Sequence, residues 1–406
     1  MLLRPLSRRP LFQLKNPSSR THLRCLRCLS TATESSATHH KEQQRQQQHH
    51  APTTSNHVQI VEVGPRDGLQ NEKTIIPLTT KIELIERLAK TGLRDIEAGS
   101  FVAPKWVPQM ADSSEILSYL LKHPPNTLDP ISYSFLAPNA KGLQNALAIL
   151  KQYPKAYQTF STPSDPSKAG ETPSANGLAV GAEEKKRERP FIEISVFAAA
   201  TETFTQKNLN TDIATSLLRF QEVIAGAKGQ GLRVRAYISV VLGCPFEGYD
   251  VDPHRVAEMA CSLMEMGADE IDLGDTTGMG TAPRTAALLR ALSAAGIRNE
   301  DLTMHFHDTY GQALVNTAVS LEHGVRRFDS SVGGLGGCPY SPGATGNVST
   351  EDLVYFMESL GMETGVDLDG MAEIGAWITG EMGKANGSLV GKAILGKRRK
   401  ERGGGV

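Results

Sequence analysis

Charged and amide side chains are concentrated in one short stretch of this 406-residue chain, the run from Glu62 to Lys73. The run follows a β-branched segment, Val58 to Val63, and sets Arg66 beside Asp67 among turn-forming glycines and a proline. A carboxylate next to a guanidinium can hold a cation with one group and stabilise a developing anion with the other. A polar surface loop with an internal ion pair is the alternative, because most exposed ion pairs contribute little. The remaining reactive residue types decide between these two interpretations.

The tripeptide His305-Phe306-His307 is the second concentration of reactive side chains. Residues two apart on a strand point to the same side, so both imidazoles face one volume while Phe306 packs outward. A single strand histidine is more often structural than a ligand, but Asp67 and Asn347 are expected on the same face. Two imidazoles, a carboxylate and an amide oxygen, without thiolate, suit octahedral Mn2+ or Mg2+ better than tetrahedral zinc.

Cys338 lies in the glycine-rich run Gly333 to Tyr340. Free cysteines are usually buried and inert, but four glycines give this one little to pack against. Glycines also permit a loop to close over a substrate. A thiol has an ordinary pKa of about 8.5, close enough to neutral for proton exchange beside a cation or an arginine. The sequence therefore indicates a catalytic role for Cys338.

Eight alternating strand and helix patterns must position these residues. We expect strands at Val58 to Val63, Asp95 to Ala98, Ile131 to Leu136, Phe191 to Phe197, Arg233 to Val241, Glu270 to Leu273, Leu302 to His307 and Arg327 to Val332. Helical patterns follow at Thr79 to Lys90, Ser113 to Lys122, Leu143 to Gln152, Asp212 to Ala227, Pro253 to Met266, Arg284 to Ala295, Gln312 to His323 and Thr350 to Leu360. Eight such units predict an α/β fold, a TIM (β/α)8 barrel. An open doubly wound sheet is the alternative, but no strand leads into a G-x-G-x-x-G turn.

Polar residues at the ends of these strands share one face of the predicted barrel. Barrel enzymes carry their catalytic groups at the C-terminal ends of the strands. Arg66 and Asp67 follow the first strand, Glu97 closes the second and Asp275 follows the sixth, while the two histidines end the seventh. We therefore expect one site at this mouth.

The segments outside the repeats divide the chain further. Residues 1–33 hold seven Arg and Lys and no acidic residue, which is typical of a mitochondrial transit peptide; an untargeted disordered tail is the alternative. Residues 34–56 are rich in Gln and His and are expected to form a disordered linker. The catalytic barrel is predicted over 57–361 with a flexible insertion at 161–189, and 362–406 is predicted to be a short C-terminal helical extension with a basic tail.

Composition excludes two classes of partner. A net charge of −1 gives no basic excess for nucleic acid. No apolar run reaches the roughly 18 to 20 residues that span a bilayer, so no membrane is expected as a partner. Outside the N-terminal segment, Cys244, Cys261 and Cys338 are too few for a disulfide framework.

Taken together, these motifs resemble the 3-hydroxy-3-methylglutaryl-CoA lyase family. The resemblance covers about His57 to Gly361 in order and is carried by Glu62 to Lys73, Glu97 to Gln109, Gly243 to Gly248, Gly274 to Thr276, His305 to Gln312 and Gly333 to Tyr340. It implies a divalent cation, Mg2+ or Mn2+, held by Asp67, His305, His307 and Asn347. It further implies catalytic roles for Arg66, Glu97, Asp275, His305 and Cys338, and substrate binding by Arg66, Gln70 and Ser100.

The implied reaction is a retro-Claisen cleavage of 3-hydroxy-3-methylglutaryl-CoA to acetyl-CoA and acetoacetate, a step of leucine degradation and ketone-body formation. A homodimer is also expected, and the N-terminal segment predicts that it lies in the mitochondrial matrix. Arg66 is expected to stabilise the thioester enolate, and Cys338, with His305 nearby, to protonate its carbon. The base that removes the hydroxyl proton is either Asp275 or a group on the ligand side.

The chain departs from the commonest family pattern at three places. Asp272 stands where such lyases often carry serine, a change expected to alter the surroundings of Asp275. The segment from Ser161 to Arg189 is extra. Residues Gly403 to Val406 lack a Ser-Lys-Leu type peroxisomal signal, so the mitochondrial address stands alone.

Two other functions remain as alternatives. A condensing synthase of the same barrel superfamily, such as isopropylmalate or homocitrate synthase, shares the first-strand Arg-Asp-Gly and the His-x-His, but usually carries a further C-terminal domain. A barrel kept only as a binding scaffold would have lost part of the constellation, and no member is missing here.

Overall fold

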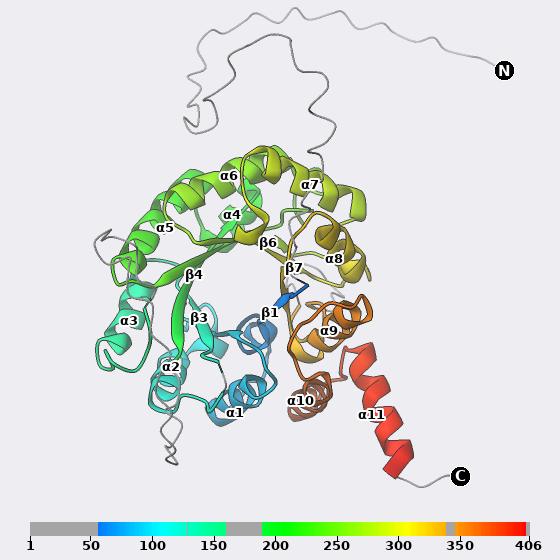
Figure 1. Ribbon diagram of the computed structural model, residues 1–406. Coiled ribbons are helices and arrows are strands. Elements are labelled where there is room, and N and C mark those ends of the chain that lie inside the picture. Colours follow the sequence, from blue (N-terminus) through cyan, green and yellow to red (C-terminus); the bar gives the residue numbers. More distant parts are fainter. Residues whose placement is uncertain (1–55, 128, 160–188, 338–345, 403–406) are drawn as a thin grey trace, which may run out of the picture. The chain divides into compact units, whose positions relative to one another are not determined.

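Eight parallel strands close into the barrel that the repeats predict (Figure 1). The structure is a computed structural model, and it describes residues 56–127, 129–159, 189–337 and 346–402. The strands are β1 (Gln59–Glu62), β2 (Asp95–Ser100), β3 (Ser132–Leu136), β4 (Phe191–Ala199), β5 (Arg233–Ser239), β6 (Glu270–Asp275), β7 (Leu302–Phe306) and β8 (Arg327–Ser330). They follow one another in chain order, and β8 pairs with β1 to complete the ring. The TIM-barrel prediction is confirmed.

Helices surround the barrel at the positions that the apolar periodicity predicts. They are α1 (Leu78–Ala89), α2 (Ser113–Lys122), α3 (Ala140–Leu150), α5 (Ile213–Lys228), α6 (Pro253–Glu265), α7 (Ala282–Ala294), α8 (Ala313–Glu322) and α9 (Thr350–Ser359). The side chains of Asn139, Asp212, Asp252 and Ser349 accept hydrogen bonds from backbone N–H groups in the first turns of α3, α5, α6 and α9. The short helix α4 (Glu202–Leu209) was not predicted, because it is mostly polar and buries only Phe204 and Thr205.

Alternation along the strands separates two kinds of core. One set of strand residues is apolar and packs under the helices, among them Ile60, Ile96, Ile194, Val234, Ile271, Phe306 and Phe328. The alternate set points into the barrel and is charged or polar although it is buried, and it includes Glu97, Glu193, Arg235, Glu270, Asp272, His305 and Asp329. A barrel interior is usually filled with branched apolar side chains. Here ion pairs fill it.

The short C-terminal helical extension predicted within 362–406 includes α10 (Leu368–Glu381). It packs against α1, α9 and the short turn η5 (Val332–Gly334), which opens the glycine-rich loop. A further helix, α11 (Leu389–Arg402), was not predicted, and it contains the run predicted as a basic tail. Most side chains of that run are exposed, but Arg398 pairs with two acidic residues of α10.

Several predictions concern residues outside the described ranges. The transit peptide at 1–33, nearly all of the linker at 34–56 and the insertion at 161–189, and the chain end at 403–406 are among them. Of the helices that the structure describes, none is long and apolar enough to cross a membrane.

Candidate active site

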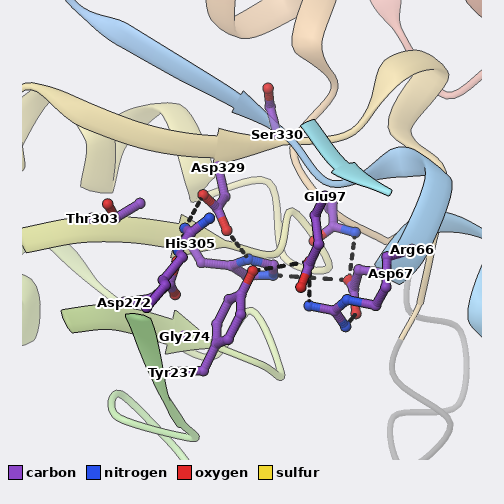
Figure 2. Close-up of polar contacts among 12 residues, drawn as sticks. Arg66, Asp67, Glu97, Tyr237, Asp272, Gly274, Thr303, His305, Asp329 and Ser330 are labelled. Carbon is purple, nitrogen blue, oxygen red and sulfur yellow. Dashed lines mark hydrogen bonds and ion pairs between the residues drawn. The ribbon is translucent and has the colours of Figure 1, made fainter. Parts of the chain in front are cut away.

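The first loop of the barrel brings Arg66 and Asp67 to the C-terminal ends of the strands. Residues Gly64–Gly68 form the single π-helical turn η1 directly after β1, with Pro65 at its start. Nη1 of Arg66 lies 2.8 Å from Oδ1 of Asp67, and its Nη2 lies 2.6 Å from Oε2 of Glu97 on β2 (Figure 2). Arg66 is only 6 % exposed. The pair therefore belongs to a buried site, and the alternative of a solvated surface loop is excluded.

Glu97 has two further partners that the sequence did not reveal. The hydroxyl of Tyr237 on β5 donates to Oε2 of Glu97 over 2.9 Å, and the hydroxyl of Ser195 on β4 lies 3.3 Å from Oε1. The ring centre of Tyr237 lies 5.3 Å from the guanidinium carbon of Arg66 and 4.8 Å from that of Arg235. The tyrosine therefore stabilises the Arg66–Glu97 pair by both its ring and its hydroxyl.

The predicted metal ligands converge beside this pair. Asp67, His305 and His307 each offer a ligand atom within 4.8 Å of the others. Nδ2 of Asn347 donates to Oδ2 of Asp67 over 2.8 Å and to the Leu335 carbonyl over 3.0 Å. Among the described residues, Oδ1 of Asn347 and Nδ1 of His307 are buried without a hydrogen-bond partner. Such atoms are usually satisfied, so this nitrogen and oxygen donor set fits a divalent cation.

The charges around the ligand group also favour the binding of a divalent cation. Burial acts to raise the pKa of Asp67, but Arg66 and the two histidines hold it below its ordinary value. Burial and the neighbouring His305 lower the pKa of His307 to about 4, so His307 is neutral at pH 7. Burial would also lower the pKa of His305, but Asp329 and further carboxylates raise it to about 9. An ionised carboxylate and a neutral imidazole are the forms that bind metal, so Asp67 and His307 are ready as ligands, whereas a cation would displace one proton from His305.

A second acidic group beneath His305 is already neutralised by an arginine. Asp272, His305 and Asp329 also place ligand atoms within 4.8 Å of one another. However, Nη2 of Arg235 bonds both Asp272 and Asp329. The guanidinium therefore supplies the positive charge that a metal would otherwise bring. Asp272 was expected to alter the surroundings of Asp275, and its bond in the structure goes to Arg235.

Asp275 ends β6 and is fully buried. The N–H of Gly280 donates to both of its oxygens, over 3.1 and 3.0 Å. Burial raises the pKa of Asp275 to about 7, although the Gly280 N–H acts against this rise. A β-carbon at position 280 would lie 2.6 Å from Oδ2 of Asp275. Glycine is required there, and a backbone donor of this kind leaves no signal in the sequence.

The other predicted site residues differ in their placement. Nε2 of Gln70 donates to Oδ1 of Asp67 over 2.5 Å, so Gln70 belongs to the cluster. Ser100 is buried at the end of β2, and its hydroxyl accepts from the N–H of Val102 over 3.2 Å. Cys338 lies outside the described residues. Its neighbour Gly337 is described, and the Gly337 carbonyl accepts from Nδ2 of Asn71 over 2.7 Å.

Fold and site together define a class, the TIM-barrel enzymes with metal-ligating residues at the carboxyl ends of their strands. The model of the HMGL-like family matches residues 57–159 and 181–378, and the chain belongs to this family.

Individual relatives cover most of the chain. The 3-hydroxy-3-isohexenylglutaryl-CoA/hydroxy-methylglutaryl-CoA lyase of Pseudomonas aeruginosa is 45% identical over 84% of this chain and 98% of its own length. The mitochondrial hydroxymethylglutaryl-CoA lyase of Bos taurus is 44% identical over 84% of this chain and 90% of its own length. A crystal structure of hydroxymethylglutaryl-CoA lyase from Pseudomonas aeruginosa aligns with a TM-score of 0.71 at 44% identity, over 85% of this chain and 99% of that one.

Proposed function

We propose that this protein cleaves 3-hydroxy-3-methylglutaryl-CoA to acetyl-CoA and acetoacetate. The observation that carries the proposal is the Arg66 fork, which contacts Asp67 of the ligand group and Glu97 with its two terminal nitrogens. The guanidinium of Arg66, which can stabilise an anion, therefore lies beside Asp67, a proposed metal ligand. A lyase that generates an enolate requires this combination. The names and extensive coverage of the two lyase relatives support this substrate over that of a condensing synthase.

A divalent cation, Mg2+ or Mn2+, is the proposed cofactor. Asp67, His305, His307 and Asn347 would hold it. When bound, the cation supplies Lewis acidity that lowers the pKa of the substrate hydroxyl. The unpartnered Oδ1 of Asn347 and Nδ1 of His307 support this assignment.

Asp275 is the proposed base, and Arg66 the proposed anion stabiliser. A carboxylate with a pKa of about 7 is suited to accept a proton near neutral pH. Asp275 removes the proton of the C3 hydroxyl, the bond between C2 and C3 breaks, and C3 becomes the ketone carbon of acetoacetate. The electron pair stays on the acetyl-CoA fragment as a thioester enolate, whose oxygen the guanidinium of Arg66 stabilises.

The remaining roles complete the proposal. Cys338 donates the proton that the enolate carbon takes up to give acetyl-CoA, with His305 assisting. Gln70 and Ser100 contribute to substrate binding together with Arg66. Glu97 orients Arg66, since the two side chains form a buried ion pair.

Product analysis tests the reaction directly. Protein treated with a chelator is incubated with 3-hydroxy-3-methylglutaryl-CoA, with and without added Mg2+ or Mn2+. Acetyl-CoA and acetoacetate are expected in equal amounts and only with the cation. Release of free CoA would indicate hydrolysis instead, and consumption of acetyl-CoA with a 2-oxo acid would indicate a condensing synthase.

Location and assembly belong to the same proposal. Residues 1–33 would direct the protein to the mitochondrial matrix, and the barrel would form a homodimer. The basic, acid-free composition of this segment supports the address, as does the mitochondrial designation of the bovine relative. A fluorescent protein fused behind residues 1–56 should enter mitochondria, and sedimentation of the purified protein should give twice the chain mass of 43.9 kDa.

A further inference from the structure

The two histidines of the ligand group differ in the contacts of their Nδ1 atoms. Nδ1 of His305 lies 2.9 Å from Oδ2 of Asp329, whereas Nδ1 of His307 is buried without a hydrogen-bond partner among the described residues. The contact follows from the barrel, because His305 on β7 is the register partner of Asp329 on β8. The side chains of His305 and Asp329 face each other in Figure 2. Of the two histidines, His305 has the buried carboxylate behind its ring.

Asp329 is in turn fixed by Arg235 of β5. Nη2 of Arg235 donates to Oδ1 of Asp329 and to Oδ2 of Asp272. Nε of Arg235 lies 3.1 Å from Oε1 of Glu270. The arginine and its three carboxylates are each at most 1 % exposed. Rotation of Asp329 would leave a buried charge unpaired, which is strongly unfavourable, so the carboxylate stays where His305 meets it.

We propose that Asp329, held by Arg235, is a positioning residue that fixes the ring of His305 for metal binding. A carboxylate at Nδ1 keeps a proton on that nitrogen, so that Nε2 offers its lone pair on the side of Asp67. Nε2 of His305 lies 4.0 Å from Oδ2 of Asp67. The negative charge also makes the imidazole a stronger ligand. This inference rests on the cation proposed above and adds a residue outside its ligand set.

Metal binding by two matched variants tests the proposal. Asp329→Asn and Asp272→Asn each remove a carboxylate that bonds Nη2 of Arg235, but only Asp329 bonds a ring nitrogen of His305. Mn2+ is titrated into chelator-treated protein and the heat of binding is measured. We expect Asp329→Asn to weaken binding by about 10- to 100-fold, and Asp272→Asn by less than about threefold. Equal effects would overturn the role of Asp329, whereas no Mn2+ binding by the unchanged protein would overturn the cation site itself.

A second measurement needs no change at Asp329. Protein labelled with 15N-histidine and loaded with Mg2+ is examined by NMR, and the signals of His305 are assigned by their loss in His305→Gln. The proposal expects the proton on Nδ1. A proton on Nε2 would overturn it, even where Asp329→Asn does not fold.

Discussion

Two groups of buried carboxylates lie in this barrel, and they differ in the partners that the fold gives them. Asp67 and Asp329 each contact an arginine, Arg66 and Arg235 respectively. Burial acts to raise the pKa of both carboxyls, but Arg66 holds that of Asp67 below its ordinary value. Arg235, together with the bonded histidine, does the same for Asp329. Both remain ionised throughout the physiological range.

Asp275 and Glu351 are fully buried and form no ion pair within the described part of the chain. Asp275 accepts from the N–H of Gly280, and Oε2 of Glu351 accepts from the N–H of Gly333 over 2.9 Å. Burial raises the pKa of Asp275 to about 7 and that of Glu351 to about 8. A neighbouring carboxylate, Glu62, contributes to the second shift.

The contrast separates two functions of a buried carboxylate. Asp67 and Asp329, each paired with an arginine, keep their charge and can hold a cation or align a cationic side chain. A carboxylate that is bonded only by N–H groups can gain or lose a proton near neutral pH. Asp67 after β1 and Asp329 on β8 thus carry fixed charge, and Asp275 carries an exchangeable proton at the end of β6.

The largest effect is expected from Asp275→Asn. The substitution keeps the shape of the side chain but removes the group that accepts the proton, so turnover should fall by about 10²- to 10⁴-fold. In the unchanged protein kcat/KM should rise with pH and level off above about pH 7, because the base must be deprotonated. The variant should lose this rise. Asp252→Asn is the control, since asparagine also caps α6; a retained pH profile in Asp275→Asn would assign the base elsewhere.

Arg66→Lys should have the next largest effect. Lysine keeps the charge but lacks the planar fork that reaches Asp67 and Glu97 at once. We expect turnover to fall by about 10²- to 10³-fold, with a much smaller change in KM. Arg87→Lys, at an exposed pair on α1, serves as the control. Near-normal turnover of Arg66→Lys in steady-state assays would show that fixed charge alone is sufficient.

The sequence predicted the charged residues and histidines of the site better than the residues that hold them in place. Alternating β-branched runs predicted eight strands, and strand ends meet at one mouth, so Arg66, Asp67 and the two histidines were found together. Tyr237 and Asp329 were not singled out, although they also contact site residues. The sequence does not reveal that Tyr237 meets Glu97, 140 positions away in the chain, because that contact depends on how the barrel closes.

Backbone contributions were not predictable from residue types. The N–H groups that bond Asp275 and Glu351 belong to glycines, whose side chains carry no chemical signal. The helix α11 was missed for a related reason. It buries only Gly391 fully, and Asp352 of α9 accepts from the Val390 N–H in its first turn over 2.7 Å. Tertiary contact rather than apolar periodicity therefore supports this helix.

A smaller effect should follow from Tyr237→Phe, which tests how much the hydrogen bond to Glu97 contributes. The change removes the 2.9 Å bond to Glu97 but keeps the ring beside Arg66. A hydrogen bond to a charged group contributes about 1.5 to 3 kcal/mol, and Arg66 still pairs with Glu97, so we expect turnover to fall about 5- to 20-fold. Substrate binding should change less than turnover. A loss as large as that of Arg66→Lys would mean that the hydroxyl itself takes part in the reaction.

The last prediction concerns stability and tests Glu351, the carboxylate that has no arginine partner and lies outside the proposed catalytic site. The pKa of Glu351 is raised in the folded state, so the folded protein binds more protons than the unfolded chain between about pH 4.5 and 8. The stability that Glu351 contributes is therefore fully present at low pH and is lost as pH rises through about 8. Glu351→Gln keeps an acceptor for Gly333 and cannot ionise. Urea unfolding should show that the free energy of unfolding falls less from pH 5.5 to 8.5 in the variant, by about 3 kcal/mol, because each pH unit between the two pKa values contributes about 1.4 kcal/mol. Identical pH dependences would mean that Glu351 has an unseen cationic partner and belongs with the paired carboxylates.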